Sequence, residues 1–401
     1  MSETNTAQML SLTVVTSASG GGQKIVSVAV EYSDVMSWRD LSIQDYQVEG
    51  FTLVDVCTSE TVRGEPADKG RFVQLLLDNT GEETNLCAME GRGPHARTVV
   101  RKPVLFVTQN RELTASDGMC VPPFTHEATT RMDLGIADSF LTTNFTTSSG
   151  KKLKYNLYIP DQLVPGQEYP IVLFMHDAGS CSDDPHAPLL QGTGATVWAI
   201  ESYYSRRPCF VLAPHYPDVC ANDAFEVTWE AEATVELLDQ LCRIYAIDRH
   251  RIYGTGQSMG CMMLCEMLLR HPHYFAGCLL VAGQWDPERM AAAKDENLWA
   301  IVSSGDKKAF PIMGSCMRNM AAAGGNLCTG HIDARADAAW LDAAIRSQKA
   351  HDANLNFTWF EGRSIVPDGM DVNPGAHHVC TWRKAYDIKA LREWLFEQRL
   401  T

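Results

Sequence analysis

The chain has 401 residues, of which 45% are hydrophobic and 21% are charged, as in an ordinary globular protein. This length exceeds that of one average domain, so two domains are expected. The net charge of −15 argues against binding of a polyanion as the main task. No basic cluster interrupts the acidity, and we expect no nucleic-acid partner.

The first eight residues, Met-Ser-Glu-Thr-Asn-Thr-Ala-Gln, lack the basic and apolar regions of a secretion signal. No stretch approaches the roughly 20 apolar residues that a membrane span needs. These features predict a cytoplasmic protein with no membrane partner. The thirteen cysteines are then expected to be free thiols. Cys261 and Cys265 share one helix face, but no other ligand pair lies at metal-binding spacing nearby, so we predict no metal and no cofactor.

The first predicted domain covers residues 1–127 and is rich in strand patterns. Alternating or apolar runs are separated by turn residues such as the glycines at 20–22, and these runs lie at residues 12–16, 24–32, 51–57 and 72–78. This pattern predicts a small β-sandwich. We expect the sandwich to have a structural role or to mediate contacts in a homo-oligomer, because its sequence shows no convincing aromatic platform for sugar binding.

The second predicted domain covers residues 128–401. Beyond Ser139, strand patterns alternate with helical ones, and the helical ones lie at residues 225–245, 310–323 and 333–349. Such alternation predicts an α/β fold, with a mostly parallel sheet and helices on both faces.

An apolar run at residues 169–175 predicts a buried parallel strand, which ends in a turn at residues 176–179. Backbone N–H groups of such a turn can form half of an oxyanion hole, where they stabilise the charge of a tetrahedral acyl intermediate. Ala178 and Asp177 are both candidates for this donor. We assign the donor to Ala178 and a substrate contact to Asp177. His176 is expected to be a packed, hydrogen-bonded side chain.

A nucleophilic serine is predicted at Ser258. Residues 252–260 read Ile-Tyr-Gly-Thr-Gly-Gln-Ser-Met-Gly, a G-x-S-x-G frame between a short strand pattern and a helical pattern at 259–270. A hydroxyl that stands free at a sharp strand-to-helix turn needs neighbours without bulk two residues to either side. Gly256 and Gly260 meet that need.

The catalytic acid should follow a later strand. The strand pattern at residues 298–305 ends at Gly305-Asp306, and Asp306 is our candidate. Asp286, after the apolar run at 279–285, is the competing candidate. Because Pro287 follows it, Asp286 also has the sequence of an ordinary helix start.

The catalytic base must be a histidine near the end of the chain, where His377 and His378 are both available. We expect them on a loop at residues 375–382, which follows a last strand at 356–360 and precedes a final amphipathic helix at 386–398. The residues alone leave the choice between the two open.

Further residues are predicted around the nucleophile. The N–H of Met259, directly after the serine, is the second expected oxyanion donor. The remaining predicted substrate contacts are Gln257, Gln284, Trp285 and His377.

Residues 152–398 resemble α/β-hydrolase esterases of the polyhydroxybutyrate-depolymerase, feruloyl-esterase and prolyl-oligopeptidase-like group, especially bacterial members with an immunoglobulin-like N-terminal domain. The stretches that carry the resemblance lie at residues 173–179, 207–214, 254–260, 302–308, 378–386 and 393–396. The resemblance implies an α/β-hydrolase fold behind an immunoglobulin-like sandwich. It also favours His378 as the base, because the histidine of such relatives stands a few residues before a tryptophan. The chain departs from the pattern at Asp177 and Cys261, where glycine is common.

Together these features predict a serine hydrolase that cleaves carboxylic esters of short-acyl or feruloyl/aryl type. Ser258 would form the acyl-enzyme, His378 would act as general base and then acid, and Asp306 would orient the histidine. Two alternatives stay open. One is a serine peptidase of the prolyl-oligopeptidase-like type, although the short catalytic domain has no propeller-like gating module. The other is a catalytically inactive binding protein on the same fold.

Overall fold

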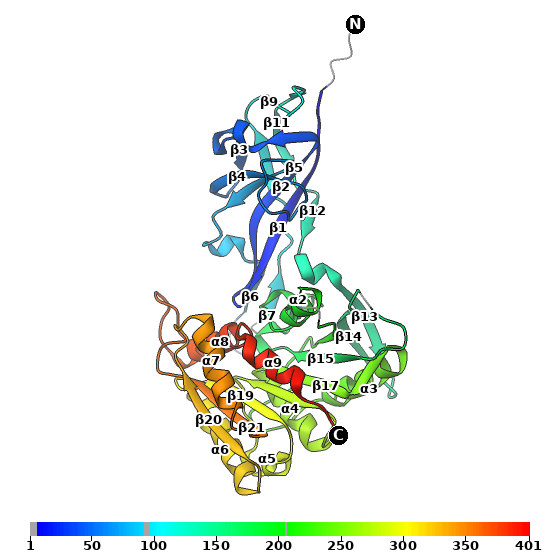
Figure 1. Ribbon diagram of the computed structural model, residues 1–401, viewed down its shortest axis with the longest axis vertical. Coiled ribbons are helices and arrows are strands. Elements are labelled where there is room, and N and C mark those ends of the chain that lie inside the picture. The colour runs from blue at the N-terminus through cyan, green and yellow to red at the C-terminus, as the bar shows by residue number, and fades with distance from the viewer. Residues whose placement is uncertain (1–5, 92–96, 162, 205–206) are drawn as a thin grey trace. The chain divides into compact units, whose positions relative to one another are not determined.

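The computed structural model describes residues 6–91, 97–161, 163–204 and 207–401 (Figure 1). The chain forms two compact units. The first comprises Met1–Ala88 and Val100–Asp138, and the second comprises Met89–Val99 and Ser139–Thr401. The domain boundary expected after residue 127 lies within the first unit, in strand β11 (Phe124–Ala128).

The first unit contains two main sheets. The larger has the order β12-β1-β2-β5-β4 and the smaller the order β11-β8-β3. The strands of the larger sheet are β1 (Met9–Ser19), β2 (Gly22–Ser37), β4 (Leu53–Ser59), β5 (Lys69–Leu77) and β12 (Arg131–Asp133), and the others are β3 (Tyr46–Val48) and β8 (Phe106–Gln109). Two short strands, β9 (Leu113–Thr114) and β10 (Cys120–Val121), pair separately.

Alternation along the strands builds the core of this unit. Val14, Val28 and Val30 are fully buried in the larger sheet, and they belong to one hydrophobic cluster with Val48 and Val107 of the smaller sheet. Residues of both sheets thus share a single core, as in a β-sandwich. The strand runs predicted from the sequence correspond to β1, β2, β4 and β5.

The second unit is built on a nine-stranded sheet with the order β13-β14-β16-β15-β17-β18-β19-β21-β20. Strands β13, β14 and β16 pair antiparallel, and the remaining pairs are parallel. The strands are β13 (Phe140–Thr146), β14 (Lys152–Tyr158), β15 (Tyr169–Met175), β16 (Phe210–His215), β17 (Ile247–Gln257), β18 (Gly277–Val281), β19 (Leu298–Ser303), β20 (Leu327–Ile332) and β21 (Leu355–Phe360).

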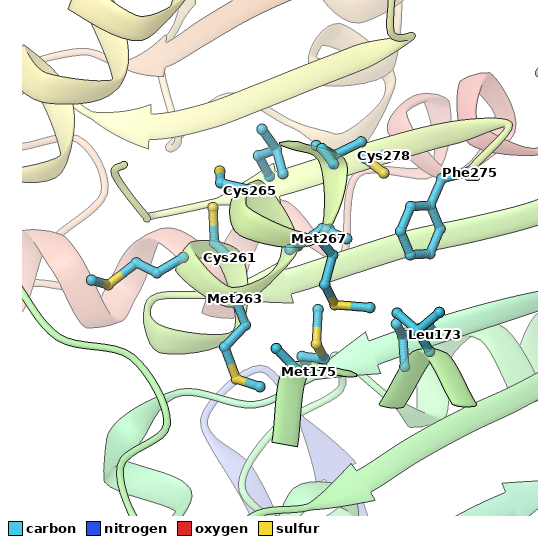
Figure 2. Packing of buried hydrophobic residues seen from close by; sticks show 14 of the residues in the cluster. Leu173, Met175, Cys261, Met263, Cys265, Met267, Phe275 and Cys278 are labelled. Carbon is cyan, nitrogen blue, oxygen red and sulfur yellow. The ribbon is translucent and has the colours of Figure 1, made fainter. Parts of the chain in front are cut away.

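Helices cover both faces of this sheet. They are α1 (Ala187–Leu190), α2 (Thr196–Tyr204), α3 (Glu230–Ile244), α4 (Met259–Arg270), α5 (Pro287–Met290), α6 (Ala309–Ala322), α7 (Ala338–Lys349), α8 (Pro374–Ala385) and α9 (Lys389–Glu397). The alternation along β15 separates the faces. Leu173 and Met175 pack with Met263 and Met267 of α4 (Figure 2), while Phe174 contacts Tyr386 beyond α8. No helix in the described ranges has the length and hydrophobicity needed to cross a membrane.

The end of the chain differs from the expectation. The predicted loop at 375–382 is part of helix α8, and the predicted final helix at 386–398 is α9, which spans only Lys389–Glu397. The reason is local: the Asn373 side chain accepts a hydrogen bond from the Ala376 N–H, and Pro374 occupies the first turn. Gly375 follows this start signal and is tolerated inside the first turn.

Candidate active site

Ser258 lies at the sharp turn between β17 and α4. Its φ of +50° and ψ of −114° are rare for a residue other than glycine, and such strain is maintained only where the surrounding structure imposes it. A Cβ atom on Gly256 would lie 2.5 Å from the Gly260 carbonyl carbon. A Cβ atom on Gly260 would lie 2.1 Å from the Met175 carbonyl oxygen. Both glycines are therefore required by close backbone packing.

Three predicted residues come together at this turn. The Oγ of Ser258 lies 2.8 Å from Nε2 of His378, and Nδ1 of His378 lies 2.5 Å from Oδ2 of Asp306. Asp306 follows β19, and His378 lies on α8, where its ring packs edge-on against Trp382. Hydroxyl, imidazole and carboxylate thus form one hydrogen-bonded chain. Within the described residues, no group of three or more His, Cys, Asp or Glu side chains is arranged to hold a metal ion.

The Asp306 carboxylate is buried, and both of its oxygens accept hydrogen bonds. Its second oxygen, Oδ1, accepts hydrogen bonds from the backbone N–H groups of Lys308 and Ala309. Burial alone would raise the pKa of Asp306. The hydrogen bond and charge of His378, together with the two backbone donors, outweigh burial and hold this pKa below its ordinary value. The carboxylate is therefore ionised at neutral pH and can stabilise a positive imidazolium.

His377 has a different environment from its neighbour. Its ring is buried, with Nδ1 2.8 Å from the Ser303 hydroxyl, and burial lowers its pKa. A Cβ atom on Gly305 would lie 2.2 Å from this ring. These contacts place His377 as a support of the loop that carries Asp306.

Two predicted substrate contacts at the end of β18 have the contacts of packed residues. Trp285 is fully buried, and its Nε1 donates to Glu266 at 3.0 Å. Gln284 is also buried, and its amide lies 3.4 Å from Asp223. Asp286, the competing acid, accepts hydrogen bonds from the first backbone N–H groups of α5. Its role in the structure is therefore that of an N-cap.

The turn after β15 is a single 3₁₀ turn, Ala178–Ser180. His176 anchors its start: Nε2 accepts from the Tyr216 N–H at 3.0 Å, so Nδ1 carries the proton that is donated to the Asp177 carbonyl at 2.8 Å. Because a trans peptide points its N–H opposite to its C=O, this bond fixes the direction of the Ala178 N–H.

Asp177 and Gln257, both predicted substrate contacts, bind each other. The buried Asp177 carboxylate accepts hydrogen bonds from Gln257 Nε2 and Ser180 Oγ, both at 2.8 Å. This pair ties the turn after β15 to the residue that precedes Ser258. No sequence signal identifies this pairing beyond a polar residue at the end of each of two strands.

We expect His176 to make stability depend on pH. Burial lowers its pKa to about 4, against an ordinary value of 6.5. Between these values the unfolded chain binds more protons than the folded one, so stability should fall with falling pH, by up to about 1.4 kcal/mol per unit from this group. Urea unfolding from pH 7 to pH 5 should therefore show a smaller decrease in His176→Gln than in the wild type. Equal decreases would contradict the assignment.

Comparison with known proteins supports the architecture. Residues 11–122 match the family model of the esterase Ig-like N-terminal domain. A solved structure of a thermostable esterase matches 97% of this chain and 100% of its own, with a TM-score of 0.83 and 24% identity. The chain is an Ig-like domain followed by an α/β-hydrolase fold. The fold class predicted from the sequence is thus confirmed.

Two further solved structures match more weakly. The feruloyl esterase module of Clostridium thermocellum is 14% identical over 63% of this chain and 88% of its own, with a TM-score of 0.39. The S-formylglutathione hydrolase of Staphylococcus aureus is 14% identical over 64% and 96%, with a TM-score of 0.36. A search of curated proteins found no match.

Proposed function

We propose that this protein is a serine esterase that hydrolyses carboxylic esters, of the short-acyl or feruloyl/aryl type, through an acyl-enzyme on Ser258. The observation that carries the proposal is the hydrogen-bonded chain from the Ser258 hydroxyl through His378 to the buried Asp306. An ionised acid that holds the imidazole leaves Nε2 free to accept the serine proton. The strained turn at Ser258 presents the hydroxyl at the end of the parallel sheet.

In the proposed reaction, Ser258 Oγ attacks the ester carbonyl while its proton passes to Nε2 of His378. The tetrahedral intermediate collapses, and the same proton goes to the departing alcohol. Water then gives up a proton to His378 and attacks the acyl-enzyme, and the product acid leaves after the proton returns to Ser258. Asp306 stabilises the imidazolium in both halves of the cycle.

The proposed oxyanion hole is formed by the N–H groups of Met259 and Ala178. Met259 is the first residue of α4, so its N–H has no acceptor within the helix and lies at the positive end of the helix dipole. The Ala178 N–H is directed by the bond from His176 to the Asp177 carbonyl. Donors of this kind each contribute about 2.7 to 4 kcal/mol to the stability of a transition state.

Matched substrates test the reaction type. We expect wild-type protein to hydrolyse p-nitrophenyl acetate, p-nitrophenyl butyrate or methyl ferulate with a higher kcat/KM than the p-nitroanilides of short peptides. The matches to an esterase structure and to an esterase-associated domain favour this order. Faster cleavage of the anilides would support the peptidase alternative. No turnover of any substrate would support a binding protein.

A further inference from the structure

A short insertion supports the proposed oxyanion turn. Residues Met89–Val99 interrupt the sequence of the first unit but belong to the second. Strands β6 (Cys87–Glu90) and β7 (Arg97–Val100) pair with each other at its ends. On β7, Thr98 is 5% exposed, and both of its polar groups are directed at the turn that follows β15.

Thr98 binds the turn through two hydrogen bonds. Its hydroxyl donates to the Gly179 carbonyl at 2.7 Å, and its backbone N–H donates to the Cys181 carbonyl at 3.1 Å. The hydroxyl also lies 3.5 Å from the sulfur of Met89, but the carbonyl is the nearer and stronger acceptor. Thr98 therefore binds the carbonyl of Gly179, within the turn, and the carbonyl of Cys181, directly after it.

The turn also has hydrogen bonds of its own. Within it, the Ser180 N–H donates to the Asp177 carbonyl at 3.1 Å and the Cys181 N–H donates to the Ala178 carbonyl at 3.3 Å. Hydrogen bonds of a 3₁₀ turn have poorer geometry than those of an α-helix. His176 fixes the first peptide of the turn. The Ser180 hydroxyl also donates to the Asp177 carboxylate at 2.8 Å, and Thr98 adds a bond to the Gly179 carbonyl from outside the turn.

The neighbouring Arg97 extends this support to a second segment. Its guanidinium lies 2.5 Å from both the Pro217 carbonyl and an Asp218 carboxylate oxygen. The N–H of the preceding Tyr216 bonds to His176. Strand β7 thus contacts the turn directly and also contacts the segment that holds its histidine. The ion pair is exposed and should contribute little stability, so the buried Thr98 should provide most of the support that β7 gives to the turn.

We infer that Thr98 is a positioning residue for the proposed ester hydrolysis. It acts by holding the Ala178 N–H in place. The inference rests on the proposed function. Thr98 binds the residue next to Ala178 and contacts no reacting atom of the triad. Oxyanion donors work only when they are aimed at the position that the negative oxygen occupies in the transition state. A loosened turn should therefore slow the chemical step and leave substrate binding largely unchanged.

Two substitutions separate the hydroxyl from the shape of the side chain. Thr98→Val keeps the branched shape and the backbone N–H but removes the hydroxyl, while Thr98→Ser keeps the hydroxyl. With a p-nitrophenyl ester, we expect kcat of Thr98→Val to fall about tenfold at a nearly unchanged KM, and Thr98→Ser to stay within about twofold of the wild type. An aryl trifluoromethyl ketone, which forms a tetrahedral oxyanion on the nucleophile, should bind Thr98→Val about tenfold more weakly.

The outcomes separate this inference from the proposed function. A wild type that neither hydrolyses esters nor binds the ketone would overturn both. An active wild type with an unchanged kcat and ketone affinity in Thr98→Val would overturn the positioning role alone, even if Tm fell. A rise in KM alone would also overturn it. If Thr98→Val does not fold, Thr98→Ala should show the same loss of kcat, and failure of both to fold would assign Thr98 to folding instead.

Discussion

Ser258→Ala is expected to lower kcat for ester hydrolysis by about 10⁶-fold, because loss of a triad nucleophile leaves only binding and oxyanion stabilisation. The substitution removes one oxygen and keeps the backbone, so the fold should be retained. Initial rates with p-nitrophenyl acetate measure the effect, and thermal unfolding shows whether the variant is folded.

Ser315→Ala is the matched control for the nucleophile. Ser315 lies on α6, and its hydroxyl donates to the Pro311 carbonyl one helical turn earlier. We expect its activity to equal that of the wild type. If Ser258→Ala kept a large part of the ester turnover while folded, the proposed acyl-enzyme would be wrong.

Asp306→Asn is expected to lower kcat by about 10⁴-fold with the fold retained. The asparagine amide can donate a hydrogen bond to Nδ1 of His378. Because Nδ1 then accepts a hydrogen bond, the neutral imidazole carries its proton on Nε2. In that tautomer the imidazole cannot accept the proton of Ser258. Steady-state kinetics at neutral pH would measure the loss.

Asp286→Asn provides the control, because Asp286 was the competing acid. Its carboxylate caps α5, and asparagine is an equally good N-cap, so stability should change by less than about 1 kcal/mol. Its kcat should not change. A larger loss of kcat in Asp286→Asn than in Asp306→Asn would show that the acid had been assigned to the wrong strand.

Local patterns in the sequence predicted much of the fold and the nucleophile. The apolar runs that became β15 and β19 are buried on both faces. A short apolar run bounded by turn residues is typical of such a buried strand. Ser258 could be predicted because its turn demands Gly256 and Gly260 within five residues of sequence. Asp306 could be predicted because it lies shortly after the end of β19. For these elements, the physical constraint acts over a few neighbouring residues.

Longer-range contacts could not be predicted in this way. The partners of the Asp177–Gln257 and Thr98–Gly179 hydrogen bonds lie 80 and 81 residues apart in the chain. Neither member of each pair has a local pattern that identifies its partner. His377 and His378 are adjacent and chemically identical, so only the resemblance to esterases favoured His378. The start of α8 could not be predicted from local propensity, because Gly375 in its first turn is a residue type that disfavours helices.

The most direct test of the proposed acyl-enzyme is mass spectrometry of protein quenched with acid during turnover of a slowly hydrolysed ester. The proposal predicts a covalent acyl group on the peptide that contains Ser258, which disappears when the ester is exhausted and never forms in Ser258→Ala. Ester turnover without an acylated protein, or acylation at another residue that decays at the rate of turnover, would contradict it.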